Sequence, residues 1–223
     1  MISRENLEEV VKDYGIEVSQ ASVSERQIFK AVEESLELEE VTAIAGVRRS
    51  GKTFLMYQLM QKHGGVYVNF ENEKLVDFTV EDFDKLYSIA LESGKKTLFL
   101  DEVQNVKAWE KFASRIHKKI KIIASGSNSS FLSSEFATAL TGRTITFTLY
   151  PLSFSEALEF KAVDASKLDS AQANANLEKY LKLGGFPRIV ATENLDLAQE
   201  YFKLIIYRDV IPRFRIKMTE AIN

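Results

Sequence analysis

The chain has 223 residues, 45% of them hydrophobic and 27% charged, which excludes a disordered chain and is typical of a folded domain with a small appendage. Its net charge of −3 argues against a protein whose whole surface binds nucleic acid, and the lack of cysteine excludes disulfides and thiolate metal sites and favours a cytoplasmic location. No stretch approaches the ~20 apolar residues of a membrane span, and the amino terminus lacks the apolar run of a signal peptide, so we expect no membrane contact.

Strands and helices are expected to alternate along the first two thirds of the chain. Short apolar runs predict buried strands, and apolar residues at helical spacing predict the helices between them. Ser24 with Gln27 has the form of a capping box and predicts an early helix through Leu36. In chain order, the further elements are a strand over 41–45, a helix over 53–63, a strand over 66–70, a helix that begins after Thr79, a strand over 97–100, a helix around Trp109, a strand over 121–124, a short helix over 136–140 and a strand over 144–149.

This alternation predicts a parallel sheet with helices on both faces. The strand over 144–149 alternates apolar residues with threonines, which is typical of an edge strand. The strands over 41–45, 97–100 and 121–124 are apolar almost throughout, which is typical of the middle of a sheet. We therefore expect an α/β core of three layers.

Beyond Pro151 the sequence predicts helices only. Ser153 with Glu156 has the form of a capping box, and two further helices are expected over 174–183 and 195–211. We interpret this part as a small helical lid. The expected division is an N-terminal helical segment over 1–40, a core over 41–150 and the lid over 151–223.

A glycine-rich loop between the first strand and the next helix carries the strongest functional signal. The pattern G-x-x-x-x-G-K-[ST] of a phosphate loop is met by Gly46, Val47, Arg48, Arg49, Ser50, Gly51, Lys52 and Thr53. Its glycines allow successive N–H groups to face a phosphate, and the helix that follows adds the positive end of its dipole. We expect Lys52 to reach the β- and γ-phosphates of ATP, Thr53 to ligate Mg²⁺, and Phe54 to belong to the nucleotide site.

The apolar strand over 97–100 runs into two carboxylates. Asp101 is expected to hold Mg²⁺ through water, and Glu102 is the candidate base that orients or deprotonates the attacking water. A strand that ends in Asp-Glu is common by itself, but its place after a phosphate loop favours a functional role. Asn69, at the end of the second strand, is a candidate to hydrogen-bond Glu102 and hold it away from water.

Three polar residues later in the chain are candidates for contacts with the γ-phosphate. Ser127 and Asn128 follow the strand over 121–124 and are sensor candidates; the alternative is a turn whose side chains satisfy their own hydrogen bonds. Arg143 precedes the last strand and is a candidate arginine finger that acts on the nucleotide of a neighbouring subunit. The alternative for Arg143 is a surface residue at a helix end.

Two basic stretches, 115–121 and 208–217, are the candidate contacts for nucleic acid. The alternative for the first stretch is a helix end at which basic side chains complement the dipole. His63 and His117 lie near helix ends among lysines, and we expect both to be solvated surface residues. A protein or a nucleic acid therefore remains open as the partner.

Six segments that occur in one order carry a resemblance: GVRRSGKT, VNFENEKL, LFLDEVQNVKAWE, ASGSNSSFLSSEFATALTGR, LYPLSFSEAL and LGGFP. The sequence resembles the archaeal-type AAA-like P-loop ATPases, a family related to the AAA+ and signal-transduction ATPases, over most of residues 40–214. Many members continue past the lid into a further carboxyl-terminal domain. We expect this sequence, which stops at Asn223, to lack that domain.

The resemblance implies a three-layer P-loop NTPase fold whose five-stranded parallel sheet has the order 5-1-4-3-2, with ATP and Mg²⁺ as cofactors. Its implied site residues are the Walker A pair Lys52 and Thr53, the Walker B pair Asp101 and Glu102, a sensor at Asn128 or Ser127, an arginine finger at Arg143, and a lid turn Gly185, Phe186 and Pro187 that approaches the nucleotide.

Other nucleotide chemistries fit the sequence less well. A GTPase would carry an Asn-Lys-x-Asp motif, which is lacking here, and a small-molecule kinase would not need Glu102 beside Asp101. A nucleotide switch with little turnover and a nucleic-acid-associated ATPase use the same motifs and stay as alternatives. The sequence predicts a Mg²⁺-dependent ATPase that works as a switch or motor.

Overall fold

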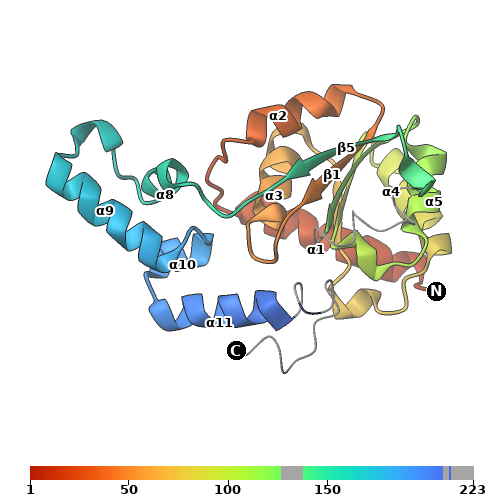
Figure 1. Ribbon diagram of the computed structural model, residues 1–223. Helices are drawn as coiled ribbons and strands as arrows, with labels where there is room; N and C mark the ends of the chain where they lie inside the picture. The colour runs from red at the N-terminus through yellow and green to blue at the C-terminus, as the bar shows by residue number, and fades with distance from the viewer. Residues whose placement is uncertain (127–137, 208–210, 212–223) are drawn as a thin grey trace. The chain divides into compact units, whose positions relative to one another are not determined.

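The computed structural model describes residues 1–126, 138–207 and 211 (Figure 1). The chain divides into two compact units. The first unit combines Met1–Ala45 with Lys52–Thr148, and the second combines Gly46–Gly51 with Leu149–Asn223. The division into an N-terminal segment, a core and a lid stays a prediction.

The first unit contains a parallel sheet with the strand order β2-β3-β4-β1-β5. This is the order 5-1-4-3-2 seen from the other edge, so the expected topology is confirmed. All residues of β1 are buried, whereas all residues of β5 keep some exposure, as expected for a central and an edge strand. The strands are β1 (Val41–Ala45), β2 (Val66–Asn69), β3 (Thr97–Asp101), β4 (Lys121–Gly126) and β5 (Thr144–Thr148).

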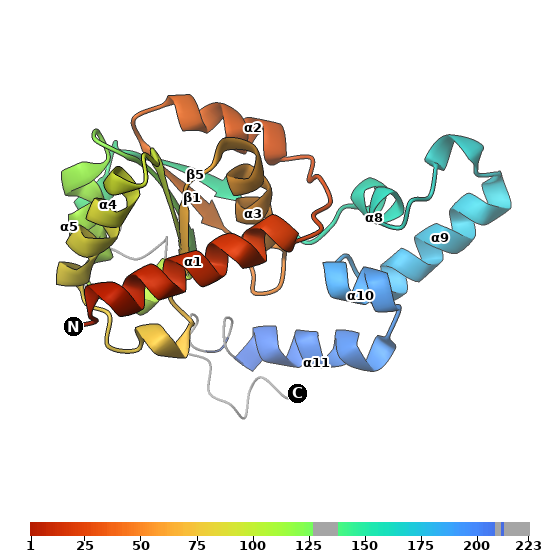
Figure 2. The ribbon, with the colours of Figure 1, turned by 180° about the vertical axis from the view of Figure 1, so that it is seen from behind.

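Helices cover both faces of this sheet. Figures 1 and 2 show α2 and α3 on one face and α4 and α5 on the other. A large apolar core lies on the face of α4 and α5 and includes Phe83 and Phe112, whose rings stack at a centroid distance of 4.5 Å. The bounds of the helices are α2 (Phe29–Glu34), α3 (Lys52–His63), α4 (Phe83–Glu92) and α5 (Trp109–Ile116).

The N-terminal helix α1 (Arg4–Gln20) packs against the edge strand β2. Its Leu7 and Val10 are buried in the same core as α4 and α5. The expected capping box at Ser24 is wrong, because α2 begins only at Phe29 and its N-cap Ile28 has no side-chain cap. Burial of Phe29, rather than a polar cap, fixes the start of that helix.

The second unit carries four described helices, α8 (Phe154–Phe160), α9 (Ser170–Leu183), α10 (Pro187–Thr192) and α11 (Leu195–Ile205). The capping box of Ser153 and Glu156 before α8 is confirmed by both of its hydrogen bonds. Helix α9 begins four residues before the expected position, because Asp169 and Gln172 form a second capping box. Helix α10 was not expected and starts at Pro187, a residue that suits the first turn of a helix.

Gly65 provides a test of the packing between α3 and the sheet. Its φ is 151°, and a Cβ at this position would lie 2.5 Å from Cε2 of Phe99. Gly65→Ala should lower the free energy of unfolding by about 2 kcal/mol or more, since neither the ring nor the backbone has room to move. The control Gly15→Ala, in α1 with open space around it, should raise stability by ~0.5–1 kcal/mol. Urea denaturation measures both, and equal effects would contradict this account.

Candidate functional site

Four of the predicted site residues meet at the carboxyl edge of the sheet in the first unit. Lys52 and Thr53 form the start of α3, and Asp101 and Glu102 follow one another at the end of β3. Oγ1 of Thr53 donates to Oδ2 of Asp101 at 2.6 Å. Nζ of Lys52 lies 3.5 Å from Oε1 of Glu102. The fold thus pairs each residue of one motif with a residue of the other.

Asp101 is fully buried, and its carboxylate is held by several donors. The hydroxyls of Tyr67 and Thr53 each donate to Oδ2 at 2.6 Å, and the Asn69 amide lies 3.5 Å from the same oxygen. Oδ1 accepts from the Ser125 hydroxyl and, at 3.1 Å, from the backbone N–H of Glu102. A buried carboxylate without such donors would be strongly unfavourable, and these contacts fix its position.

Glu102 adopts a backbone conformation that is rare for a residue with a side chain. Its φ and ψ are 50° and 42°, in the left-handed region. Such strain persists only where the surroundings impose it, and it is concentrated at functional sites. Nε2 of Gln104 donates to Oε2 of Glu102 at 2.6 Å, while Lys52 faces the other oxygen. The carboxylate is therefore oriented at both oxygens.

The predicted partner of Glu102 was wrong. Asn69 directs its amide N–H toward Asp101, and its Oδ1 accepts the backbone N–H of Glu71 at 2.8 Å. Gln104, two residues after Glu102, supplies the side-chain hydrogen bond instead. The tight turn that follows β3 brings these two side chains together, and no pattern of residues predicts this contact.

The paired hydroxyl and carboxylate of Thr53 and Asp101 fit a magnesium ion. Mg²⁺ prefers oxygen ligands and is usually held by one or two protein groups together with substrate phosphates, not by a cage of protein ligands. The described part of the chain has no cluster of three or more histidines, cysteines or carboxylates that could hold a metal. The donor set suits a metal that arrives with phosphates.

The phosphate loop belongs to the second unit and is described within it. Arg49 and Gly51 have φ values of 68° and 104°, and the N–H of Ser50 donates to the carbonyl of Val47 at 3.2 Å. A Cβ on Gly46 would lie 2.5 Å from the carbonyl oxygen of Leu149, so no other residue fits there. Gly46 and Gly51, the two glycines of the motif, are thus both required by the conformation and packing of the loop.

Arg49 also contacts helix α11 of the second unit. Its guanidinium lies 4.0 Å from the centroid of the Tyr201 ring, and Phe186 meets the same ring edge-on at 5.6 Å. The predicted lid turn before Pro187 is thereby linked to the phosphate loop through one aromatic ring. Gly185 packs so closely on Leu152 that a Cβ would lie 2.0 Å from its carbonyl oxygen.

The remaining candidates lie elsewhere or outside the described residues. Ser127 and Asn128 fall in the segment 127–137, which is not described. Phe54 is exposed on α3, next to Tyr57. Arg143 precedes β5, and one of its guanidinium N–H groups donates to Oγ of Ser114 at 2.5 Å.

The first basic stretch, 115–121, is tied to its own chain. Arg115 pairs with Asp84 at 2.6 Å, and Nζ of Lys121 donates to three backbone carbonyls at 2.5–3.0 Å. His117 is buried and its Nδ1 lies 3.1 Å from the carbonyl oxygen of Glu39, so the expectation of a solvated histidine was wrong. These contacts favour a structural role over nucleic-acid binding. Residues 208–210 and 212–217 of the second stretch lie outside the described residues.

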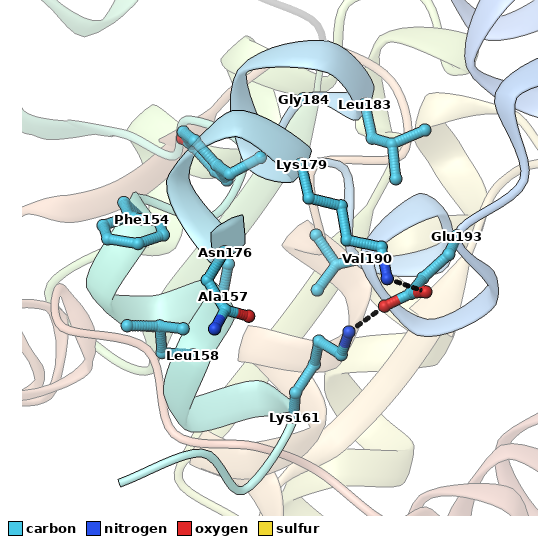
Figure 3. A pocket seen from close by; sticks show the side chains of 11 residues that line it. Phe154, Ala157, Leu158, Lys161, Asn176, Lys179, Leu183, Gly184, Val190 and Glu193 are labelled. Atoms are coloured by element: carbon cyan, nitrogen blue, oxygen red, sulfur yellow. Dashed lines mark hydrogen bonds and ion pairs between the residues drawn. The ribbon is translucent and has the colours of Figure 1, made fainter. Parts of the chain in front are cut away.

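A pocket in the second unit contains none of the predicted site residues. Phe154, Leu158 and Val190 give it an apolar floor (Figure 3). At its edge Lys161 and Lys179 both form ion pairs with Glu193. The pocket is the opening between α8, α9 and α10 of the small lid core.

Comparison with known proteins decides the family. Residues 38–158 match the family model described as AAA domain. This chain belongs to the AAA domain family. AAA domain proteins of this kind are P-loop ATPases, so at the level of the family the chain is a nucleotide-binding ATPase.

Two curated proteins are similar to this chain over nearly its whole length. An uncharacterized protein of Methanocaldococcus jannaschii is 37% identical over 229 residues, which is 97% of this chain and 51% of that protein. An uncharacterized protein of Haemophilus influenzae is 32% identical over 222 residues, 92% of this chain and 55% of that protein. The AAA domain chain therefore spans about half the length of these curated relatives.

Two solved structures share the fold. A Walker-type ATPase of Pyrococcus abyssi matches with a TM-score of 0.54 and 16% identity, over 89% of this chain and 79% of that one. PCH-2 of C. elegans matches with a TM-score of 0.50 and 14% identity, over 74% and 59%. The AAA domain chain has their three-layer α/β P-loop NTPase fold. No helix among the described residues is both long and apolar enough to cross a membrane.

The phosphate loop lysine yields a direct test of nucleotide binding. The ammonium of Lys52 is 4% exposed and needs anionic partners there, so Lys52→Ala should weaken ATP–Mg²⁺ binding by roughly 10- to 100-fold. The control Lys62→Ala, in the last turn of the same helix and largely exposed, should bind ATP as wild type does. Calorimetric titration of both folded variants is the measurement, and unchanged affinity of Lys52→Ala would contradict the site.

Proposed function

We propose that this AAA domain protein binds ATP with Mg²⁺, hydrolyses it to ADP and phosphate, and uses the cycle as a switch or motor. The observation that carries the proposal is the double pairing of Lys52 with Glu102 and of Thr53 with Asp101. A loop lysine beside a candidate base, and a hydroxyl beside a carboxylate, are the groups that phosphoryl transfer to water requires.

Lys52 connects the phosphates to the base. Its ammonium carries three N–H donors and can therefore contact phosphate oxygens while it also faces Glu102. The Glu102 carboxylate, which is 13% exposed, would accept a proton from a water next to the γ-phosphate. Gln104 restricts the other carboxylate oxygen, so the base has one direction in which it can act.

Thr53 and Asp101 are the proposed metal residues. The hydroxyl of Thr53 donates a hydrogen bond to Asp101, and the lone pairs of its oxygen stay available to ligate Mg²⁺. When bound, the metal supplies charge neutralisation for the phosphates. The phosphate loop Gly46–Gly51 would supply backbone N–H groups, with Ser127, Asn128 and Pro187 as further proposed contacts.

The hydrolysis step is tested at Glu102. Glu102→Gln keeps the shape of the side chain but removes the base, so ATP binding should persist while turnover falls by ~10²- to 10⁴-fold. Glu73→Gln, the same change at an exposed carboxylate after β2, is the control and should be neutral. Phosphate release and ATP affinity are measured side by side.

The outcome also separates the proposed ATPase from a nucleotide switch with little turnover. A wild-type protein that binds ATP but releases phosphate no faster than Glu102→Gln would favour the switch. Equal and rapid turnover of the two proteins would remove Glu102 from the mechanism.

We further propose that Arg143 acts on the nucleotide of a second copy of the chain. Thr144 pairs with Val41 and Thr148 with Ala45, so Arg143 lies at the amino edge of the sheet. The length of β1, roughly 3.3 Å per residue, separates it from the start of its own phosphate loop. The side chain is exposed at that edge and can reach a neighbour.

A mixing experiment tests this role. Arg143→Ala keeps an intact phosphate loop and Lys52→Ala keeps an intact arginine, so each variant alone should be nearly inactive and the mixture should regain part of the activity. An arginine finger contributes ~10³-fold or more in rate, which makes the recovery easy to detect. Normal hydrolysis by Arg143→Ala alone, or a dead mixture of associated variants, would exclude the role.

A further inference from the structure

The Asp101 carboxylate is fixed from both neighbouring strands. Strand β3, which ends at Asp101, lies between β2 and β4. From β2, the Tyr67 hydroxyl donates to Oδ2 at 2.6 Å, and from β4, the Ser125 hydroxyl donates to Oδ1. One oxygen is therefore held from each side, which sets the rotation of the carboxylate about its Cβ–Cγ bond.

Tyr67 is itself immobilised by two other tyrosines. Its ring is fully buried and meets the rings of Tyr14 and Tyr57 edge-on, at centroid distances of 5.1 and 4.9 Å. The hydroxyl of Tyr57 donates to Glu17 of α1 at 2.7 Å. Tyr67 is thus the member of this tyrosine cluster whose hydroxyl reaches Asp101.

The Tyr67 hydroxyl is a donor to a charged group, at 2.6 Å from Oδ2 of Asp101. A hydrogen bond to a charged group contributes more than one between neutral groups. Loss of this donor would leave Oδ2 with the more distant Asn69 amide and with Thr53, the residue that would also ligate the metal.

We propose that Tyr67 is a positioning residue for the metal-binding carboxylate of Asp101. It holds Oδ2 in the orientation in which the Thr53 hydroxyl and Asp101 can face one metal ion. The proposal rests on the proposed function, because it requires that Thr53 and Asp101 hold Mg²⁺ together with ATP.

Tyr67→Phe tests the role, because it keeps the ring and removes only the hydroxyl. The probe is adenylyl imidodiphosphate, whose affinity is measured by calorimetry once with EDTA and once with Mg²⁺. Tyr67→Phe should bind the nucleotide as the wild type does in EDTA. The factor by which Mg²⁺ increases this affinity should be roughly tenfold smaller in Tyr67→Phe than in the wild type. Tyr14→Phe, which removes a hydroxyl of the same cluster that contacts the Asn69 carbonyl and the Asn72 side chain, should keep the whole gain.

The arms of this experiment separate the two proposals. A wild-type protein with no gain from Mg²⁺ would overturn the proposed metal site and the role of Tyr67 with it. A wild-type gain that Tyr67→Phe retains in full would overturn the role of Tyr67 alone. Binding of Mn²⁺ with the same nucleotide, followed by electron paramagnetic resonance, should show the same tenfold loss.

A double variant covers the case in which Tyr67→Phe does not fold. Asp101→Asn removes the buried charge, so the double variant of Tyr67→Phe with Asp101→Asn should fold and bind as Asp101→Asn alone does. Such non-additivity is expected when one residue acts through the other. A double variant that is clearly worse than Asp101→Asn, or that also fails to fold, would contradict the proposal.

Discussion

The site depends on compensating one buried negative charge. Asp101 lies at the end of the inner strand β3, where water does not reach it, and an uncompensated carboxylate there would cost several kcal/mol (roughly 3–5) of stability. Its donors come from β2, from β4 and from the first turn of α3. A sheet in which β3 lies between β2 and β4 brings these donors together, so the strand order supplies the hydrogen bonds that Asp101 needs.

Lys52 and Glu102 form a second pair of opposite charges beside Asp101. Both side chains are largely withdrawn from solvent and lie next to the Thr53–Asp101 pair, because each motif contributes two consecutive residues. The peptide that joins Lys52 to Thr53 and the one that joins Asp101 to Glu102 therefore lock the two pairs together. A displacement of α3 along the sheet would disturb both pairs at once.

Much of this arrangement follows from local sequence, and the rest comes from long-range contacts. The apolar strands, the phosphate loop motif and the cap at Ser153 carry signals within a few residues of one another, whereas the strand order was expected from the family resemblance. Tyr67, Ser125 and Gln104 carry none, because their partners lie up to 34 residues away or across a turn that periodicity does not describe. Asn69 was assigned to the wrong carboxylate for this reason, although its edge of the sheet was right. His117 was misplaced because the carbonyl that it contacts belongs to a segment 78 residues earlier.

The left-handed backbone of Glu102 lowers the stability of the fold at a residue that catalysis is proposed to need. A glycine adopts that conformation without strain, so a glycine at this position would relax the turn after β3 and relieve a partly buried charge. Laboratory evolution that selects for heat resistance alone should therefore drift toward replacing the candidate base. Natural sequences that keep the glutamate in spite of this loss of stability would indicate selection for ATP hydrolysis. Sequences that have replaced it would indicate domains that bind nucleotide without hydrolysing it.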